Sequence, residues 1–460
     1  MTWACASRTP PATGAPSPQP TSKPPDAPSP PAPVVEPPAP PPVIPVPRSE
    51  VVPSECAVIQ EPGLPIATVA LGETVNPANA PRPSNDSERL VFRQLYDTLV
   101  RVDCMGRVVP GLASSWRRSI DGRTWIVTLP PEARFSDGSP VTAGAVLALW
   151  SRDGVGGDLQ PHVNRLVQSV ISVDDRTLAV LLRSPRVDAP YALAHSDLAI
   201  AKPVGGAAWP LGTRSAHVTS DRGSMTVTTA TGASIQFLAP RGDPRDLLDE
   251  SVDLLITRDR AALDYAATLP QFQSMPLAWQ RTQVLLSPRR ARTSPSLSDE
   301  ARQTLANDAV RGEARGAVGP YWWQGLTDCE IPPPRVQEPG SRPSGRVVHD
   351  ANDSAARDLA ERLVGLDRRT YQRATGLAGE ALALARRRGS DAAYVTSFDS
   401  RPFDPCRELQ VVVEGAPWLD PETIVPLVDT RQRAIVRRGH SGVVSEWDGG
   451  LLIAGADDQR

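Results

Sequence analysis

The fold is decided by the stretch from Glu88 to Trp150, which reads ERLVFRQLYDTLVRVDCMGRVVPGLASSWRRSIDGRTWIVTLPPEARFSDGSPVTAGAVLALW. Asn85 precedes its first glutamate by three residues, as in a capping box, and apolar residues then recur at helical spacing as far as Val100. Asp121-Gly122 lies between two strand-like runs and predicts a tight hairpin, because both residues can take positive φ. Thr142 is placed as the N-cap of a second, apolar helix.

This order of elements resembles one known family. The helix, the PGLA turn, the DGRTW hairpin and the ARFSDGSPVTA helix start are similar to the N-terminal lobe of the peptide/nickel class (family 5) of ABC-transporter extracellular solute-binding proteins. The resemblance implies an α/β, two-lobed periplasmic-binding-protein-like fold of the cluster C type. It also implies a first lobe that is discontinuous in sequence.

The resemblance covers roughly residues 60–460 and sets the expected domain boundaries. Lobe one is expected at residues 57–240 and lobe two at 241–415. A return segment at 416–460 is expected to complete lobe one. The chain is shorter than is usual for the class, so lobe two is expected to be reduced.

Length and charge agree with this organisation. The chain has 460 residues and a formal net charge of −3. A single core stops growing near about 250–300 residues, so the length allows at least two cores. The charge is not that of a nucleic-acid-binding protein, and no nucleic-acid partner is expected. No apolar run approaches the roughly 20 residues that a transmembrane helix requires.

The sequence contains none of the motifs that would indicate an enzyme. It lacks a G-x-S-x-G elbow, an H-E-x-x-H helix, a Walker loop and a glycine-rich dinucleotide fingerprint. The five histidines are scattered along the chain, without metal-ligand spacing. We therefore expect a protein that is not an enzyme, with no cofactor and no metal site.

Residues 1–56 differ in composition from the rest. Eighteen of the chain's 50 prolines lie between Pro10 and Pro47, which predicts a solvated, disordered, polyproline-II-like linker. Cys5 follows a small residue, as in a bacterial lipoprotein signal, but only four residues precede it, without a basic or an apolar region. Either the true start lies upstream and Cys5 is a lipid anchor, which we favour, or Cys5 is an ordinary residue of a disordered tail.

Four further cysteines lie in the remainder of the chain: Cys56, Cys104, Cys329 and Cys406. None forms a C-x-x-C motif, so a zinc site is not expected. In an exported protein, four cysteines permit two disulfides with three possible connectivities. The most local pairing, Cys56 with Cys104 and Cys329 with Cys406, is preferred. Four buried free thiols remain the alternative.

The resemblance also indicates where a ligand would bind. After an apolar run at residues 66–71 the chain reads GETVNPAN, at the position where the family has a loop in its ligand cleft. Thr74, Val75 and Asn76 are therefore candidate ligand-binding residues.

A second candidate is the segment SFDSRPFD at residues 397–404, followed by proline. In peptide-binding members of the family, a similar loop of lobe two supplies an aspartate that pairs with the amino terminus of the ligand. This implies that Asp399 or Asp404 has that role. The alternative for Asp404 is an Asp-Pro turn that leads into a helix.

These features predict a monomeric, extracytoplasmic solute-binding component of an ABC importer, in the periplasm or on the cell surface. Its expected partners are a peptide-like small molecule, an ABC permease and, through Cys5, the membrane. The alternative is a degenerate scaffold that acts as a cell-envelope interaction or regulatory lipoprotein without transport. That alternative rests on the segment PLGTRSAHV at residues 210–218, which stands where the family has a GTGPY-like loop.

Overall fold

The structure is a computed structural model, and it describes residues 54–154, 157–184, 189–214, 216–221, 223–229, 232–240, 242–287, 297–309, 313–326, 329–335, 345–389 and 392–453. Cys5 and nearly all of the proline-rich segment lie outside these residues. The chain divides into two units, Met1–Pro45 and Val46–Arg460, and only the second is described below. None of the described helices is long and apolar enough to cross a membrane.

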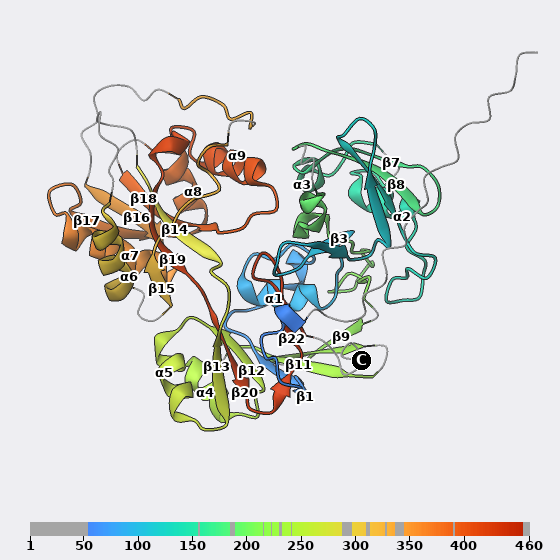
Figure 1. Cartoon of the computed structure of the whole chain (residues 1–460), viewed down its shortest axis with the longest axis horizontal. Helices are drawn as coiled ribbons and strands as arrows, with labels where there is room; N and C mark the ends of the chain where they lie inside the picture. The colour runs from blue at the N-terminus through green and yellow to red at the C-terminus, as the bar shows by residue number, and fades with distance from the viewer. Residues whose placement is uncertain are drawn as a thin grey trace, which may run out of the picture. The chain divides into compact units, whose positions relative to one another are not determined.

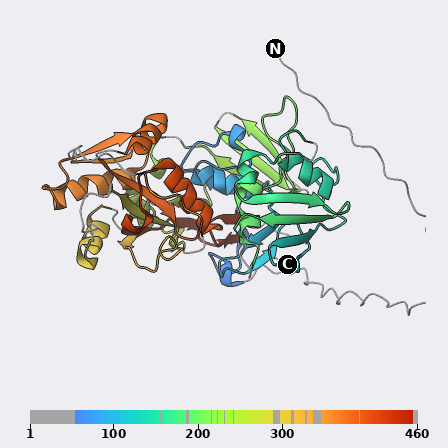
Figure 2. The ribbon, with the colours of Figure 1, turned by 90° about the horizontal axis from the view of Figure 1, so that it is seen from above.

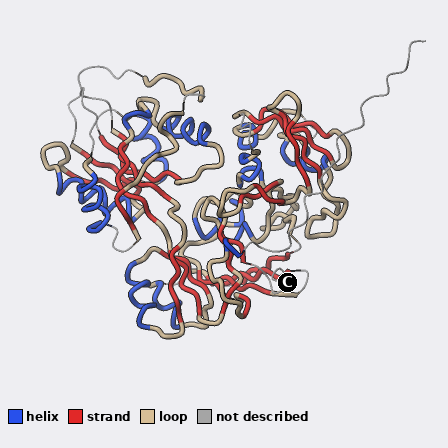
Figure 3. Tube along the Cα trace, in the orientation of Figure 1, coloured by secondary structure: helices blue, strands red, loops and turns tan. Residues whose placement is uncertain are grey.

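The helices and strands of the described residues are labelled in Figure 1 and coloured by type in Figure 3. The α-helices are α1 (Asp86–Arg93), α2 (Ala143–Trp150), α3 (Pro161–Asn164), α4 (Pro244–Asp249), α5 (Arg260–Thr268), α6 (Asp299–Ala309), α7 (Ser354–Leu366), α8 (Gly379–Arg388) and α9 (Pro405–Gly415). The 3₁₀ helices are η1 (Ser54–Cys56), η2 (Pro77–Asn79), η3 (Tyr191–Ala194), η4 (Ser196–Leu198) and η5 (Pro421–Thr423). The strands are β1 (Leu64–Pro65), β2 (Thr68–Ala70), β3 (Val100–Val102), β4 (Val108–Pro110), β5 (Ser115–Arg118), β6 (Thr124–Thr128), β7 (Val167–Ser172), β8 (Thr177–Leu182), β9 (Ala216–Asp221), β10 (Ser224–Thr229), β11 (Ser234–Leu238), β12 (Leu254–Thr257), β13 (Phe272–Pro276), β14 (Arg281–Leu286), β15 (Ala314–Gly316), β16 (Arg346–Asp350), β17 (Arg373–Leu377), β18 (Ala392–Asp399), β19 (Val425–Thr430), β20 (Arg433–Arg437), β21 (His440–Ser441), β22 (Val443–Ser445) and β23 (Leu451–Ile453).

The first sheet has seven strands in the order β13-β20-β12-β2-β11-β10-β9. Strand β2 lies at its centre and pairs in parallel with β11 and β12. Because neighbouring residues of a strand face opposite sides, Leu254 packs with α1 on one face while Leu255 packs with α4 and α5 on the other. Both faces of this sheet are therefore covered at β12, whereas β11 alternates exposed and buried residues and has one covered face.

The second sheet has six strands in the order β15-β19-β14-β18-β16-β17. Leu285 packs with α6 and α7 on one face, whereas Val284 and Leu286 pack with α9 and part of α8 on the other. Figure 1 shows these two pairs of helices on either side of β14 and β18. Strands β16, β17 and β18 run parallel to one another.

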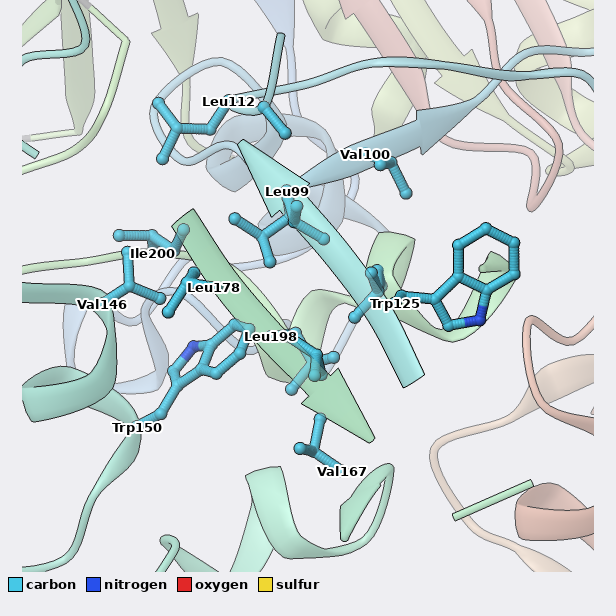
Figure 4. Packing of buried hydrophobic residues seen from close by; sticks show 14 of the residues in the cluster. Leu99, Val100, Leu112, Trp125, Val146, Trp150, Val167, Leu178, Leu198 and Ile200 are labelled. Atoms are coloured by element: carbon cyan, nitrogen blue, oxygen red, sulfur yellow. The ribbon is translucent and has the colours of Figure 1, made fainter. Parts of the chain in front are cut away.

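A smaller four-stranded sheet, β5-β6-β8-β7, contains the hairpin predicted from Asp121-Gly122. Gly122 has a φ of 72°, and the Asp121 carboxylate accepts a hydrogen bond from the Thr124 amide at 2.9 Å. Figure 4 shows how Trp150 of α2 and Leu178 of β8 pack in the core beneath this sheet. Figure 2 shows the strands of the same sheet side by side in green and cyan.

The helix caps predicted in the deciding stretch are present. The Asn85 side chain accepts a hydrogen bond from the Glu88 amide at 2.8 Å, and Thr142 caps α2 in the same way at 3.1 Å. The Glu88 carboxylate does not close the box onto Asn85. It is buried and accepts hydrogen bonds from the Ser84 and Asn76 amides at 2.7 and 2.9 Å.

The helical periodicity extends further in the sequence than the helix does in the structure. Helix α1 ends at Arg93, and Val100 begins strand β3, which pairs with β4. Leu95, Tyr96 and Leu99 are nevertheless all buried. The apolar spacing therefore correctly predicted which residues are buried. The buried residues after Arg93, however, lie outside the helix.

The sheets divide the chain differently from the boundaries expected at residues 240 and 415. Strands β12 and β13 follow residue 240 but belong to the first sheet, and β19 follows residue 415 but belongs to the second. Residues 277–280 and 431–432 are the segments that lead from one sheet to the other. Strand β20 returns to the first sheet between β12 and β13, so the part built on that sheet is discontinuous in sequence.

The described residues contain two disulfides. Cys56 is bonded to Cys104 and Cys329 to Cys406, with Cα–Cα distances of 5.6 and 5.3 Å. This is the pairing preferred on the basis of sequence proximity. The first disulfide joins η1 to the turn between β3 and β4. The second joins the segment 329–335 to the first turn of α9.

Candidate functional site

A cleft of about 990 Å³ lies where the two sheets approach each other. Two pairs of parallel strands direct their carboxyl ends toward the cleft. They are β2 and β12 in the first sheet, and β16 and β18 in the second. Ligands of open α/β sheets bind in the crevice outside such strand ends. The position of these strand ends therefore identifies the cleft as the candidate binding site.

Asp86, in the first turn of α1, is the centre of a charged cluster in the cleft. Its carboxylate lies 3.0 Å from Arg258, which follows β12, and 2.8 Å from Arg281, which begins β14. Gln432, between β19 and β20, donates a third hydrogen bond at 3.1 Å. Burial raises the pKa of Asp86, but Arg281, Arg258 and Arg89 outweigh burial, so the pKa falls below its ordinary value and the carboxyl group stays ionised.

Helix α1 presents two further charged residues on the same face, because Asp86, Arg89 and Arg93 follow at intervals of three and four residues. Arg89 lies 3.8 Å from Asp399 and 3.6 Å from Asp448. Arg93 forms ion pairs with Asp448 and with the buried Glu446. The helix thus links charged groups from both sheets along one wall of the cleft.

Asp399 is a carboxylate of the cleft with a loosely held cation partner. It ends strand β18, its side chain is 41% exposed, and Arg89 at 3.8 Å is the nearest cation among the described residues. A charge-assisted hydrogen bond is about 2.7–2.9 Å long, so this pair is held by charge rather than by a short hydrogen bond. Burial between the walls of the cleft raises the pKa of Asp399, although Arg89 and Arg281 act in the opposite direction.

Asp404 does not line the cleft. Its side chain is buried and caps α9 by accepting a hydrogen bond from the Arg407 amide at 3.0 Å, with Pro405 as the first helical residue. Burial raises the pKa of this carboxyl group, and the hydrogen bond from Arg407 partly offsets the effect. Asp404 is therefore the N-cap of α9, as expected of an Asp-Pro turn, and it lies outside the candidate site.

The loop containing Thr74, Val75 and Asn76 lies beside the cleft, but these three residues are not among its lining residues. The two residues before them, Gly72 and Glu73, are. Asn76 caps η2 by accepting a hydrogen bond from the Ala78 amide, and its own amide donates to Glu88. The sequence thus located the loop and missed its lining residues by one or two positions.

A smaller cavity of about 80 Å³ adjoins the cleft and shares Arg89, Asp399 and Asp448 with it. His195 lines this cavity, 3.9 Å from both Asp197 and Glu408. Burial lowers the pKa of His195, but Glu408 and Asp197 outweigh burial and raise it overall. Among the described residues, no cluster of three or more His, Cys, Asp or Glu side chains could hold a metal ion.

The charged residues of the cleft that were not predicted from the sequence include Asp86, Arg89, Arg258, Arg281 and Asp448. The first two could have been identified from their spacing on one face of α1. Arg258 could have been identified from its position directly after the apolar run that forms β12. Nothing in the local sequence indicates Arg281 or Asp448, because their partners lie 195 and 355 residues away.

The fold is that of the two-lobed periplasmic binding proteins. Among solved structures, a dipeptide-binding protein from Pseudoalteromonas sp. SM9913, in complex with Met-Leu, covers 84% of this chain and 99% of its own chain, with a TM-score of 0.63 and 14% identity. NikA from Brucella suis, in complex with Fe(III)-EDTA, covers 85% and 99%, with a TM-score of 0.58 and 15% identity.

Sequence comparison finds similarity to one family over part of the chain. A family model described as "Bacterial extracellular solute-binding proteins, family 5 Middle" matches residues 107–230. The periplasmic murein peptide-binding protein MppA of Escherichia coli (strain K12) is 42% identical over 62 residues, which are 14% of this chain and 11% of that protein. The nickel-binding periplasmic protein of the same organism is 37% identical over 78 residues, 17% of this chain and 15% of that protein. The matched segments thus span less than a fifth of each of these two relatives.

Proposed function

We propose that this protein is the extracytoplasmic solute-binding component of an ABC importer, which captures a small, amine-bearing, peptide-like molecule and delivers it to a membrane permease. Similarity to the family over residues 107–230 and the periplasmic location of the named relatives support this proposal. So do the ligands of similar folds, which include Met-Leu and, in a Helicobacter pylori protein, the peptide STSA. The observation that carries the proposal is the carboxylate of Asp399.

Asp399 has the properties expected of a group that binds a ligand amine. It lies in the cleft, it is partly exposed, and its closest described cation is 3.8 Å away. A raised pKa means that the surroundings stabilise its charged form less well than water does. An ammonium group that entered the cleft would supply the missing stabilisation, since an opposite charge at close range favours the ionised carboxylate.

Capture would couple to movement of one sheet relative to the other. The sheets are connected through residues 277–280 and 431–432, and the cleft has walls from both. A ligand shifts such an equilibrium only by its difference in affinity between the open and closed arrangements. A ligand that contacts Asp399 of β18 and residues that follow β12 would have that difference, because these groups belong to opposite walls.

A screen by thermal unfolding tests the proposal. Amino acids, dipeptides, longer peptides, nickel complexes and sugars would be added to folded protein at increasing concentration. A ligand at a hundredfold excess over its Kd stabilises the folded state by about 2.7 kcal/mol, which such a scan resolves. At least one amine-bearing ligand is expected to raise the Tm.

The second candidate function is a scaffold without transport, and the contact between Arg89 and Asp399 favours it. Arg89 belongs to α1, which packs on the first sheet, and it already places a cation beside Asp399 of the second sheet. An internal cation of this kind could substitute for the amine of a ligand. A flat response of folded protein to every compound in the screen would favour the scaffold over the transporter.

We further propose that Cys5 carries a lipid anchor and that the proline-rich segment is a tether. These residues lie outside the described part of the chain, so the support comes from sequence alone. Protein expressed from the native gene is expected to partition into detergent, and Cys5→Ser is expected to move it to the aqueous phase. An unchanged partition in the variant would remove the anchor from the proposal and leave the solute-binding function intact.

A further inference from the structure

The loop at residues 400–404, between β18 and α9, reaches from the second sheet into another part of the molecule. Phe403 is buried and belongs to the hydrophobic core beneath the sheet β5-β6-β8-β7. The other buried members of that core lie in the segment from Leu99 to Ile200. Helix α9, which follows the loop, packs on the second sheet through Leu409. The loop therefore places an aromatic side chain from one part of the chain in the core of another.

Arg401 makes a second contact two residues earlier in the same loop. Its guanidinium lies over the ring of Trp447, 4.8 Å from the centroid, and its Nη1 donates to the Cys104 carbonyl at 3.5 Å. Trp447 itself packs against the core that contains Phe403. A buried aromatic ring and a cation over an aromatic face both stabilise the contact between the two parts, and neither requires a ligand.

His195 adds a charged group to this contact. The Asp197 amide donates to Nδ1 of His195 at 3.0 Å, so the hydrogen of the neutral imidazole is on Nε2. Nε2 lies 3.9 Å from the carboxylate of Glu408 in α9, and the imidazole meets the ring of Phe403 edge to face at 6.3 Å. A neutral N–H binds a carboxylate weakly at such a distance, whereas an imidazolium forms an ion pair with it.

We propose that the loop at residues 400–404 is a latch that holds the second sheet against the core beneath β5-β6-β8-β7 whether or not a ligand is bound, with Phe403 as its anchor and the pair of His195 and Glu408 as its pH-sensitive contact. Phe403, Arg401, His195 and Glu408 do not line the larger cleft. The latch is thus separate from the candidate binding site. It limits the fraction of molecules that are open for a ligand to enter.

The charges around His195 decide the direction of the pH effect. Burial lowers the pKa of His195, but Glu408, Asp197 and Asp448 outweigh burial and raise it above the ordinary value of 6.5. The remaining charged residues that line the small cavity beside His195 are the cations Arg89, Arg93, Arg101, Arg214 and Arg401 and the anions Asp97 and Asp399.

The latch is expected to strengthen as the pH falls. Because the pKa of His195 is raised in the latched arrangement, the stabilisation is fully present below the pKa of the released histidine and is lost as the pH rises through the latched value. The released value is the ordinary one, so the change occurs above about pH 6.5. His162 of α3, on which Asp197 also acts, does not contribute to this change, since burial and Arg82 lower its pKa.

Distances between two spin labels test the latch without any ligand. Labels introduced as non-canonical amino acids at the exposed residues Ile171 of β7 and Leu384 of α8 leave both disulfides intact. Wild-type protein at pH 6 is expected to show one dominant short distance. The ratio of long to short distances should rise about twofold to fivefold at pH 8.5, as expected when a partly exposed ion pair is lost.

Phe403→Ala should increase the ratio of long to short distances at least about tenfold at both pH values, because the anchor loses its buried ring. Phe403→Leu keeps an apolar side chain and should largely restore the wild-type distances. If Phe403 only stabilised the core, Phe403→Ala would lower the Tm and leave the distances unchanged. Unchanged distances in this variant, in protein shown to be folded, would overturn the latch.

His195→Gln and Glu408→Gln should each remove the pH dependence, because neither variant can form an ion pair across the contact. His217→Gln is the matched control, since His217 is an exposed histidine of the edge strand β9, and this variant should keep the wild-type response. A pH response that persists in His195→Gln would overturn the role of the histidine. No ligand is used in these measurements, so either negative result leaves the proposed function standing.

Discussion

Asp86 of helix α1 lies 2.8 Å from Arg281 of strand β14, so one ion pair joins a helix packed on the first sheet to a strand of the second. Arg258 and Gln432 complete the hydrogen bonding of the same carboxylate. Gln432 lies in one of the two segments that lead from sheet to sheet. The charged cluster around Asp86 therefore lies at one of the segments that connect the two sheets.

Asp86→Asn is expected to lower the free energy of unfolding by about 1–2 kcal/mol. The variant leaves two partly buried guanidinium groups without their carboxylate. The loss should remain below the roughly 3–5 kcal/mol of a fully buried pair, because a quarter of each side chain is exposed. Urea unfolding measures the change, and Asp264→Asn, at an exposed pair, is the control. Equal stability of the two variants would contradict a structural role of the Asp86 cluster.

The carboxyl groups of Asp86 and Asp399 should respond to pH in opposite ways. The folded-state pKa of Asp86 is lowered, so its contribution to stability is present above its unfolded pKa and is lost as the pH falls through the folded value. The folded-state pKa of Asp399 is raised, so in the ligand-free protein its ionisation costs stability, and that cost appears as the pH rises through its unfolded value and then its folded value. Asp399→Asn should therefore raise the Tm of the free protein at pH 7 and have no such effect near pH 3. A lower Tm of this variant at pH 7 would contradict the assignment.

Asp404 is predicted to be a helix cap and not a ligand group. Asp404→Ala should lower the free energy of unfolding by about 1 kcal/mol, since the Arg407 amide loses its acceptor. Asp404→Asn keeps an acceptor and should lose less. Ligand affinity, measured by calorimetry on folded protein, should be the same in both variants as in the wild type. A tenfold loss of affinity in Asp404→Asn would return this residue to the binding site.

The two disulfides give a chemical test of the structure and of export. Non-reducing peptide mapping of exported protein should find Cys56 linked to Cys104 and Cys329 linked to Cys406. Replacing the first pair by alanine should lower the free energy of unfolding by about 2–4 kcal/mol, because the bond closes a loop between residues 48 positions apart. Four free thiols in the exported protein would contradict the pairing.

Local chemistry could be predicted from the sequence, and long-range chemistry could not. Asn85, Thr142 and Asp121-Gly122 act on amides within a few residues, so their caps and hairpin followed from the local pattern. The same pattern overextended α1, because buried apolar residues in turns have the spacing of a helix.

The residues of the cleft were harder to predict from the sequence than the caps and the hairpin. Resemblance to a family located Asp399, which lines the cleft, but could not distinguish it from Asp404 five residues later. The Asp86 cluster brings together residues 86, 258, 281 and 432, and only the pairing of sheets places them side by side. The boundaries at residues 240 and 415 missed the sheet assignments for the same reason, because strand pairing across more than a hundred residues leaves no local signal.

The central claim is that Asp399 binds the amine of a ligand, and calorimetry with the ligand found by thermal screening tests it most directly. Asp399→Asn should weaken binding by about tenfold or more, since the ammonium loses its charged partner inside the cleft. N-acetylation of the ligand should cost the wild-type protein a similar factor and should cost the variant little. Asp358→Asn, at another aspartate of the cleft, should bind as the wild type does. Unchanged affinity in Asp399→Asn, with the variant shown to be folded, would contradict the account.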